Sequence, residues 1–204
     1  MTNKKLIILG AGGHARVILD IAIQCHYEVV GFLDDHTDIQ SISGYPVLGA
    51  IDACMTFRHD PDMAFIIGIG SNQTRADLSA RYPLAWASLV HPRAVIGMNA
   101  KIGEGTVVMA NATINPDASI GRHVIINTSC VVEHDCQIGD CAHISPGAVL
   151  AGSVTIGKGT HVGAGAVVRN QIAITSGCLI GAGAVVVRNI LVPGTYVGVP
   201  AHLL

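Results

Sequence analysis

The chain has 204 residues, of which 50% are apolar and 13% are charged, and its formal net charge is −2. It is too apolar to be disordered, and it lacks the basic surplus of a general nucleic-acid-binding protein. No run of about 18 apolar residues occurs, so we expect no membrane span. The short apolar start, soon interrupted by glycines, is not a signal peptide, and we expect a cytoplasmic protein.

The first ninety residues alternate between strand and helix patterns. Buried-strand patterns occur at 5–9, 28–33 and 64–68, a helical pattern occurs at 16–24, and a second helix is expected to end near Tyr82. This order predicts a small Rossmann-like α/β domain that binds a nucleotide, which we place at residues 1–86.

The turn between the first strand and the first helix resembles a phosphate-binding loop. Gly10, Gly12 and Ala15 form a GxGxxA pattern, which can place a phosphate at the helix N-terminus. Asp34 and Asp35 follow the second strand, where a carboxylate can accept a hydrogen bond from a sugar hydroxyl or a base N–H. A dinucleotide needs a larger sheet, so the pattern favours a single nucleotide such as the UDP of a nucleotide sugar. The structural alternative is a tight turn with two solvated aspartates.

A six-residue repeat occupies the rest of the chain. Steps of six from Val90 to Val192 give eighteen positions, all Val, Ile or Leu. The residue two before each step is usually small, and glycine often follows the step. This pattern predicts short strands with two inward side chains, and corners where glycine permits a tight or positive-φ backbone. Hexapeptide repeats form triangular coils of about 18 residues, so we expect six coils of a parallel β-helix over residues 87–204.

The cysteines and histidines do not have the spacing of a metal site. No CxxC, HxH or HExxH pattern occurs, so we expect no metal cofactor. Cys130, Cys136 and Cys178 fall on inward repeat positions, where we expect them to be small apolar core residues.

Six segments carry a resemblance to a known family. They are GAGGHA (10–15), FLDD (32–35), IGIGSNQTR (67–75), NTSCVVEHDCQIGD (127–140), AHISPGAVLAGSVTIG (142–157) and VGVPA (197–201). Together they make nearly the whole chain resemble the sialic-acid O-acetyltransferase/bacillosamine-pathway family of hexapeptide-repeat sugar acetyltransferases. The resemblance implies a left-handed coil, acetyl-CoA as co-substrate, and a homotrimer.

The resemblance also implies roles for individual residues. It implies uridine-type recognition by Asp34 and Asp35 and further substrate contacts at Gly12, Gly13, His14 and Gly70. It implies acetyl-CoA contacts at His143, Gly152, Ala164 and Ala182.

The Glu-His-Asp segment at 133–135 fits the chemistry of acetyl transfer. A neutral imidazole has a pKa near ~6.5, close to working pH, so His134 is the predicted general base. Asp135 would hold the imidazole tautomer and stabilise the imidazolium, and Asn127 is a candidate contact to the acceptor amine. We expect His134 at a corner of the coil, on the outer surface between subunits.

Residues whose sequence separation equals one full coil should lie on neighbouring coils. Gly152 follows His134 by one coil, so its N–H should be placed to bond the thioester oxygen. His161 follows His143 by the same interval, so these two side chains should stack.

We therefore predict direct acetyl transfer from acetyl-CoA to the 4-amino group of a nucleotide-linked amino-deoxy sugar, with UDP as the first choice. An O-acetyltransferase acting on sialic acid or another sugar hydroxyl is an alternative with the same fold, as is an N-acetyltransferase acting on a dTDP- or GDP-amino sugar. A non-catalytic β-helix scaffold is a third alternative, against which the Glu-His-Asp segment argues. The sequence leaves the nucleobase and the sugar stereochemistry open.

Overall fold

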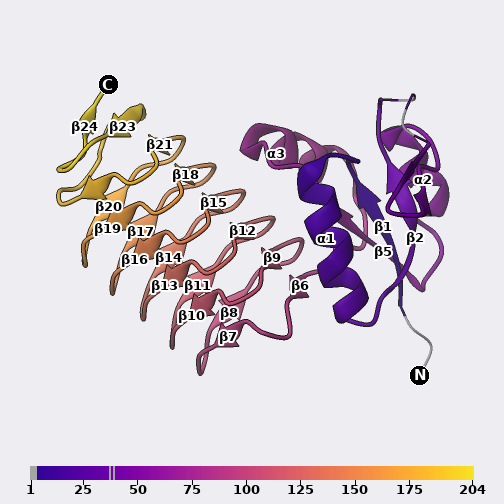
Figure 1. Cartoon of the computed structure of the whole chain (residues 1–204), viewed down its shortest axis with the longest axis horizontal. Helices are drawn as coiled ribbons and strands as arrows, with labels where there is room; N and C mark the ends of the chain where they lie inside the picture. Colours follow the sequence, from indigo (N-terminus) through magenta and orange to yellow (C-terminus); the bar gives the residue numbers. More distant parts are fainter. Residues whose placement is uncertain (1–3, 37, 39) are drawn as a thin grey trace. The chain divides into compact units, whose positions relative to one another are not determined.

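A computed structural model of the chain describes residues 4–36, 38 and 40–204 (Figure 1). It divides into two compact units, Met1–Val90 and His91–Leu204. Each unit is considered by itself below.

The first unit contains a parallel sheet of three strands in the order β2-β1-β5. The strands are β1 (Lys5–Leu9), β2 (Glu28–Leu33) and β5 (Met63–Ile67), and the main helices are α1 (Gly13–Gln24) and α3 (Asn72–Arg81). The predicted order of strands and helices is therefore confirmed. Helix α1 starts three residues before the predicted start because its first turn, Gly-His-Ala, has no apolar periodicity. No helix in the described ranges is long and apolar enough to cross a membrane.

The segment between β2 and β5 is more ordered than the loop that the sequence predicts. It holds the hairpin strands β3 (Ser41–Ile42) and β4 (Tyr45–Pro46), a 3-10 turn η1 (Ile51–Ala53) and helix α2 (Cys54–Phe57). Ile51 and Cys54 pack with Leu9, Leu33 and Phe65 in the core on one face of the sheet. Elements of two to four residues are too short to produce a periodic pattern, so the sequence did not reveal them.

The second unit is a parallel β-solenoid of about six turns, drawn from magenta to yellow in Figure 1. One face, named here the valine face, consists of β7 (Val95–Ile96), β10 (Thr113–Ile114), β13 (Val131–Val132), β16 (Val149–Leu150), β19 (Val167–Val168) and β22 (Val185–Val186). The polar face consists of β8 (Lys101–Ile102), β11 (Ser119–Ile120), β14 (Gln137–Ile138), β17 (Thr155–Ile156) and β20 (Ala173–Ile174). The histidine face includes β9 (Val107–Val108), β12 (Ile125–Ile126), β15 (His143–Ile144), β18 (His161–Val162), β21 (Leu179–Ile180) and β23 (Thr195–Val197), and β24 (His202–Leu203) pairs antiparallel with β23. Strand β6 (Leu89–Val90) ends the first unit.

Paired strands in the solenoid are separated in sequence by three hexapeptides, as the repeat predicts. Thr113 pairs with Val131, for example, and His143 pairs with His161. The step residue and the residue two before it point inward, and Cys130, Cys136 and Cys178 are buried as predicted. The thiols therefore fill space in the core.

The corners of the solenoid correct one part of the prediction. The glycines directly after each step do not have positive φ; positive φ occurs two residues later, as at Asn99, Asp135 and Gly159. The glycine after the step is needed for close approach instead. A Cβ added at Gly157 would lie 2.3 Å from the backbone nitrogen of Ser176, on the next coil.

The repeat does not continue unbroken to Val192, so this prediction is wrong at its C-terminal end. Val192 is 61% exposed, whereas Ile190 is 5% exposed and pairs with Ile174. Tyr196 pairs with Ile180. In both pairs the partners are closer in sequence than three hexapeptides, so the last turn is two residues short. The apolar run from Ile190 to Val192 made both registers look equally good in the sequence.

Candidate active site

A cavity of about 600 Å³ opens in the first unit, where β1, β2 and β5 end. Its lining includes all six predicted substrate contacts of this unit, namely Gly12, Gly13, His14, Asp34, Asp35 and Gly70. Parallel strands bring their carboxyl ends to one edge of a sheet, which is why segments distant in sequence meet here. Ligand pockets usually have volumes of about 300–1,000 Å³, so the cavity is large enough for a nucleotide.

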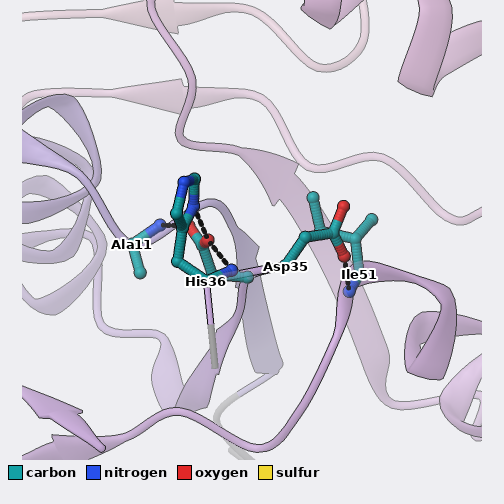
Figure 2. Close-up of polar contacts among 5 residues, drawn as sticks. Ala11, Asp35, His36 and Ile51 are labelled. Atoms are coloured by element: carbon teal, nitrogen blue, oxygen red, sulfur yellow. Dashed lines mark hydrogen bonds and ion pairs between the residues drawn. The ribbon is translucent and has the colours of Figure 1, made fainter. Parts of the chain in front are cut away.

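The two aspartates at the end of β2 have different roles in the fold (Figure 2). Asp34 Oδ2 accepts from Ala11 N–H at 2.6 Å, and Asp34 Oδ1 accepts from the backbone and the ring of His36. Burial would raise the pKa of Asp34, but these hydrogen bonds outweigh it and hold the pKa below its ordinary value. Asp35 is exposed and uses Oδ1 to accept from Ile51 N–H at 3.0 Å. Asp34 therefore anchors the glycine loop, whereas Asp35 is exposed and uses only one of its two carboxylate oxygens in the hydrogen bond to Ile51.

His14 is a neutral histidine on the wall of this cavity. Burial, and secondarily the charge of Arg75, lower its pKa to about 4. Its buried Nε2 has no hydrogen-bond partner among the residues described. Arg75 donates to the carbonyl of Gly70 at 2.9 Å and to Asn72 Oδ1 at 2.9 Å, which holds the loop after β5. Neither Arg75 nor His36 was predicted from the sequence, although Arg75 ends the segment IGIGSNQTR and His36 follows FLDD.

His134 lies at a corner of the solenoid and is exposed, as predicted. Its Nδ1 lies 2.7 Å from Asp135 Oδ2, and both side chains are more than half exposed. The hydrogen bond to Asp135 raises the pKa of His134. With Nδ1–H donating to the carboxylate, Nε2 carries the lone pair, so the pair has the geometry of an oriented general base.

Gly152 leaves room for the His134 ring. A Cβ at Gly152 would lie 2.6 Å from His134 Nε2, so any side chain there would displace the ring. The backbone joins the two coils at this corner, since Ser153 N–H donates to the His134 carbonyl. No carbonyl of the described chain accepts from Gly152 N–H. This N–H and Nε2 therefore lie on neighbouring coils of one corner, named here the His134 corner.

The other predicted residues of the solenoid lie on the histidine face and the corner that follows it. The rings of His143 and His161 stack at a centroid distance of 4.5 Å, as their one-coil interval predicts. Asn127 Nδ2 lies 3.0 Å from His143 Nε2. Ala164 and Ala182 are exposed at this corner, one coil apart, and we name it the Ala164 corner.

The predicted solenoid residues thus fall into two groups in one chain. The His134 corner and the Ala164 corner are separated by the valine face, which is one six-residue side of the coil. The fold therefore places Asn127 and His134 at different corners of the coil, at opposite ends of β13. Among the residues described, no group of three or more His, Cys, Asp or Glu side chains could hold a metal ion.

Comparison with known proteins agrees with this organisation. Residues 5–82 match the family described as the PglD N-terminal domain, and residues 83–164 match the GMPPB C-terminal domain. The acetyltransferase domain of PglB from Neisseria gonorrhoeae is 37% identical, with a TM-score of 0.93 over 99% of this chain and 100% of that chain. A perosamine N-acetyltransferase from Caulobacter crescentus, solved with CoA and GDP-perosamine, is 34% identical, with a TM-score of 0.93 over 98% of this chain and 96% of that chain.

A curated relative points to the same enzymes. UDP-N-acetylbacillosamine N-acetyltransferase from Bacillus subtilis is 40% identical over 112 residues, which cover 52% of this chain and 52% of the relative. The match thus spans about half the length of that protein. The α/β unit and the hexapeptide solenoid together match solved acetyltransferases over nearly the whole chain, which places the chain in the hexapeptide-repeat class of acetyltransferases. The chain belongs to the bacillosamine-pathway family of these enzymes.

Proposed function

We propose that this protein transfers the acetyl group of acetyl-CoA to the 4-amino group of a nucleotide-linked amino-deoxy sugar. The observation that carries the proposal is the nucleotide-sized cavity lined by all six predicted substrate residues of the first unit. In this proposal residues 1–86 bind the nucleotide sugar, with a Rossmann-like arrangement, and residues 87–204 form a left-handed coil that binds acetyl-CoA and carries out the chemistry. The relatives act on, or were solved with, nucleotide-linked amino sugars of this kind.

The His134 corner supports direct transfer. The acceptor amine attacks the thioester carbonyl carbon, and His134 Nε2 takes a proton from the amine as the C–N bond forms. Gly152 N–H donates to the oxyanion of the tetrahedral intermediate. The C–S bond then breaks, and the imidazolium, stabilised by Asp135, returns the proton to the CoA thiolate. No covalent acetyl-enzyme is needed.

Nucleotide recognition is assigned chiefly to Asp35. Both carboxylate oxygens of Asp34 accept hydrogen bonds, from Ala11 and His36. Asp35 retains an oxygen that can accept a hydrogen bond from a base N–H. The neutral imidazole of His14 also lines this cavity, and its buried Nε2 has no hydrogen-bond partner among the described residues. UDP remains the first choice, and GDP is the closest rival because a relative was solved with GDP-perosamine.

The valine face supports a homotrimer with the active site between subunits. Five of its six outward positions are valine, namely Val95, Val131, Val149, Val167 and Val185. The outward positions of the polar face are Lys101, Ser119, Gln137, Thr155 and Ala173. Valine faces packed around a three-fold axis would place the His134 corner of one subunit beside the Ala164 corner of the next. Asn127, His143, Ala164 and Ala182 could then complete the site around His134.

An acceptor panel tests the activity. The protein is incubated with acetyl-CoA and UDP-, dTDP- or GDP-linked 4-amino sugars or free sialic acid, and thiol release is followed. We expect release with a nucleotide-linked amino sugar, and UDP as the preferred nucleotide. Release with sialic acid alone would instead support the O-acetyltransferase alternative. No release with any acceptor would leave the scaffold alternative.

A variant tests the base. His134→Ala should lose about 10²–10⁴-fold in turnover, the usual contribution of a general base, while nucleotide-sugar binding persists. His59→Ala, which alters an exposed histidine of the first unit, is the control and should keep full turnover. Near-normal turnover of His134→Ala would remove His134 as the base.

A further inference from the structure

The acidic and basic residues are distributed unevenly along the chain. All fourteen Asp and Glu residues precede Cys141, and the segment from Cys141 to Leu204 carries Lys158, Arg169 and Arg188 without any acid. The C-terminal coils of the solenoid are therefore purely cationic, although the whole chain has a net charge of −2. Such a local field favours a polyanionic ligand at this end of the solenoid.

Two of the three cations share a hollow. Arg169 and Arg188 line a cavity of about 390 Å³ together with the amide side chains of Asn170, Gln171 and Asn189. Both arginines are exposed, and within the described ranges neither forms an ion pair or a side-chain hydrogen bond. Their donors are available for a ligand. Guanidinium groups next to amide donors suit phosphate, because each can supply several N–H groups to its oxygens.

The hollow lies on the His134 corner. Asn170 and Arg188 follow His134 and Gly152 on this corner at successive intervals of one coil. With coils about 4.8 Å apart, Asn170 is about 10 Å and Arg188 about 14 Å above His134 along the solenoid. A ligand whose reacting end lies at His134 would therefore meet the arginines with a part several bonds away.

We propose that Arg169 and Arg188 bind the phosphate groups of acetyl-CoA. This inference rests on the proposed function, because it places the thioester between His134 and Gly152. In acetyl-CoA the pantetheine arm separates the thioester from the diphosphate and the 3′-phosphate, so the anionic groups must lie away from the reacting carbon. The arginines lie on the same corner at such a separation. The nucleotide-sugar diphosphate is assigned to the cavity of the first unit.

CoA binding to the full-length protein tests the proposal without depending on the acceptor. Isothermal titration compares CoA, dephospho-CoA and UDP on the unaltered protein and on Arg169→Ala, Arg188→Ala and Lys158→Ala. Lys158 is the matched control, because it belongs to the same acid-free segment but lies on the corner after the polar face. Each arginine variant should bind CoA about tenfold more weakly, as expected for loss of a charge-assisted hydrogen bond. Lys158→Ala should bind CoA normally.

The titrations with dephospho-CoA and UDP identify which phosphate group the arginines bind. If an arginine holds the 3′-phosphate, its variant should bind CoA and dephospho-CoA with similar affinity; if it holds the diphosphate, both ligands should weaken together. UDP binding should be unchanged in every variant. Unchanged CoA affinity in both arginine variants, or equal loss in Lys158→Ala, would overturn the proposal and leave the proposed function intact. Failure of the unaltered protein to bind CoA would overturn both.

Discussion

The proposed chemistry of this protein depends on a few atoms at one corner of the solenoid. His134 Nδ1 and Asp135 Oδ2 are held 2.7 Å apart, and this hydrogen bond raises the pKa of His134. A general base works in its neutral form, so kcat/KM should fall as the pH drops through this raised pKa. Asp135 has positive φ (61°) at the turn, and the corners from Asn99 to Gly183 repeat this backbone conformation.

The role of Asp135 can be tested through the pH profile. Asp135→Asn keeps the shape of the side chain and suits positive φ, but it removes the negative charge. The pKa of His134 should then decrease, so the acidic limb of kcat/KM should move to lower pH, and the maximal rate should fall by ~10²-fold as orientation is lost. Glu133→Gln, a neighbouring charge that does not bond the ring, should move the limb less. If the acidic limb of kcat/KM does not move in Asp135→Asn, Asp135 does not set the pKa of the general base.

Gly152 is expected to matter because it has no side chain. Gly152→Ala would place a Cβ 2.6 Å from His134 Nε2, so the ring must rotate away from its position. Turnover should fall by at least about tenfold, while the melting temperature changes little because both residues are at the surface. Ser176→Ala, at the same position of another corner, should leave both quantities unchanged. Normal turnover in Gly152→Ala would mean that the ring does not need this position.

At the scale of the element, the solenoid uses glycine in two different ways at its corners. Gly157 approaches the backbone of the next coil, whereas Gly159, two residues later, has a φ of +66° and open space around its Cβ position. Gly157→Ala should destabilise the protein by about 1–3 kcal/mol through overpacking. Gly159→Asn should cost less than about 1 kcal/mol, because asparagine tolerates positive φ and already occupies this turn position at Asn99 and Asn111. Denaturant unfolding of both variants measures the difference, and equal costs would contradict these roles.

Among the strands, helices and turns, some features could be predicted from the sequence and others could not. The inward positions were predictable because a period of six appears in hydrophobicity alone. The hairpin β3–β4, helix α2 and the shortened last turn were not, since a two-residue strand or a uniformly apolar run has no distinguishable period. Gly157 and Gly159 look alike in the sequence, and only the path of the neighbouring coil distinguishes their roles.

At the scale of the whole molecule, the proposed assembly makes the active site depend on association. Val149→Arg places a charge at the centre of the valine face, where burial without a partner is costly. The variant should lose the trimer in light scattering and lose activity with it. Thr155→Arg, on the outward side of the polar face, is the matched control and should keep both. A fully active monomer of the unaltered protein would contradict a site between subunits.

The sequence by itself determined the period of the solenoid, the inward cysteines, the succession of strands and helices in the first unit and the residues that line its cavity. These features depend on the order of residues along the chain or on the fixed length of one coil. Because each coil has the same length, residues one coil apart in the sequence stack on each other. Only the tertiary structure decided that Asp34 holds the glycine loop while Asp35 is exposed, that burial and Arg75 keep His14 neutral, and that His134 and Asn127 lie at different corners. Each of these depends on distances between segments far apart in the chain, and those distances are set by packing, which no local pattern encodes.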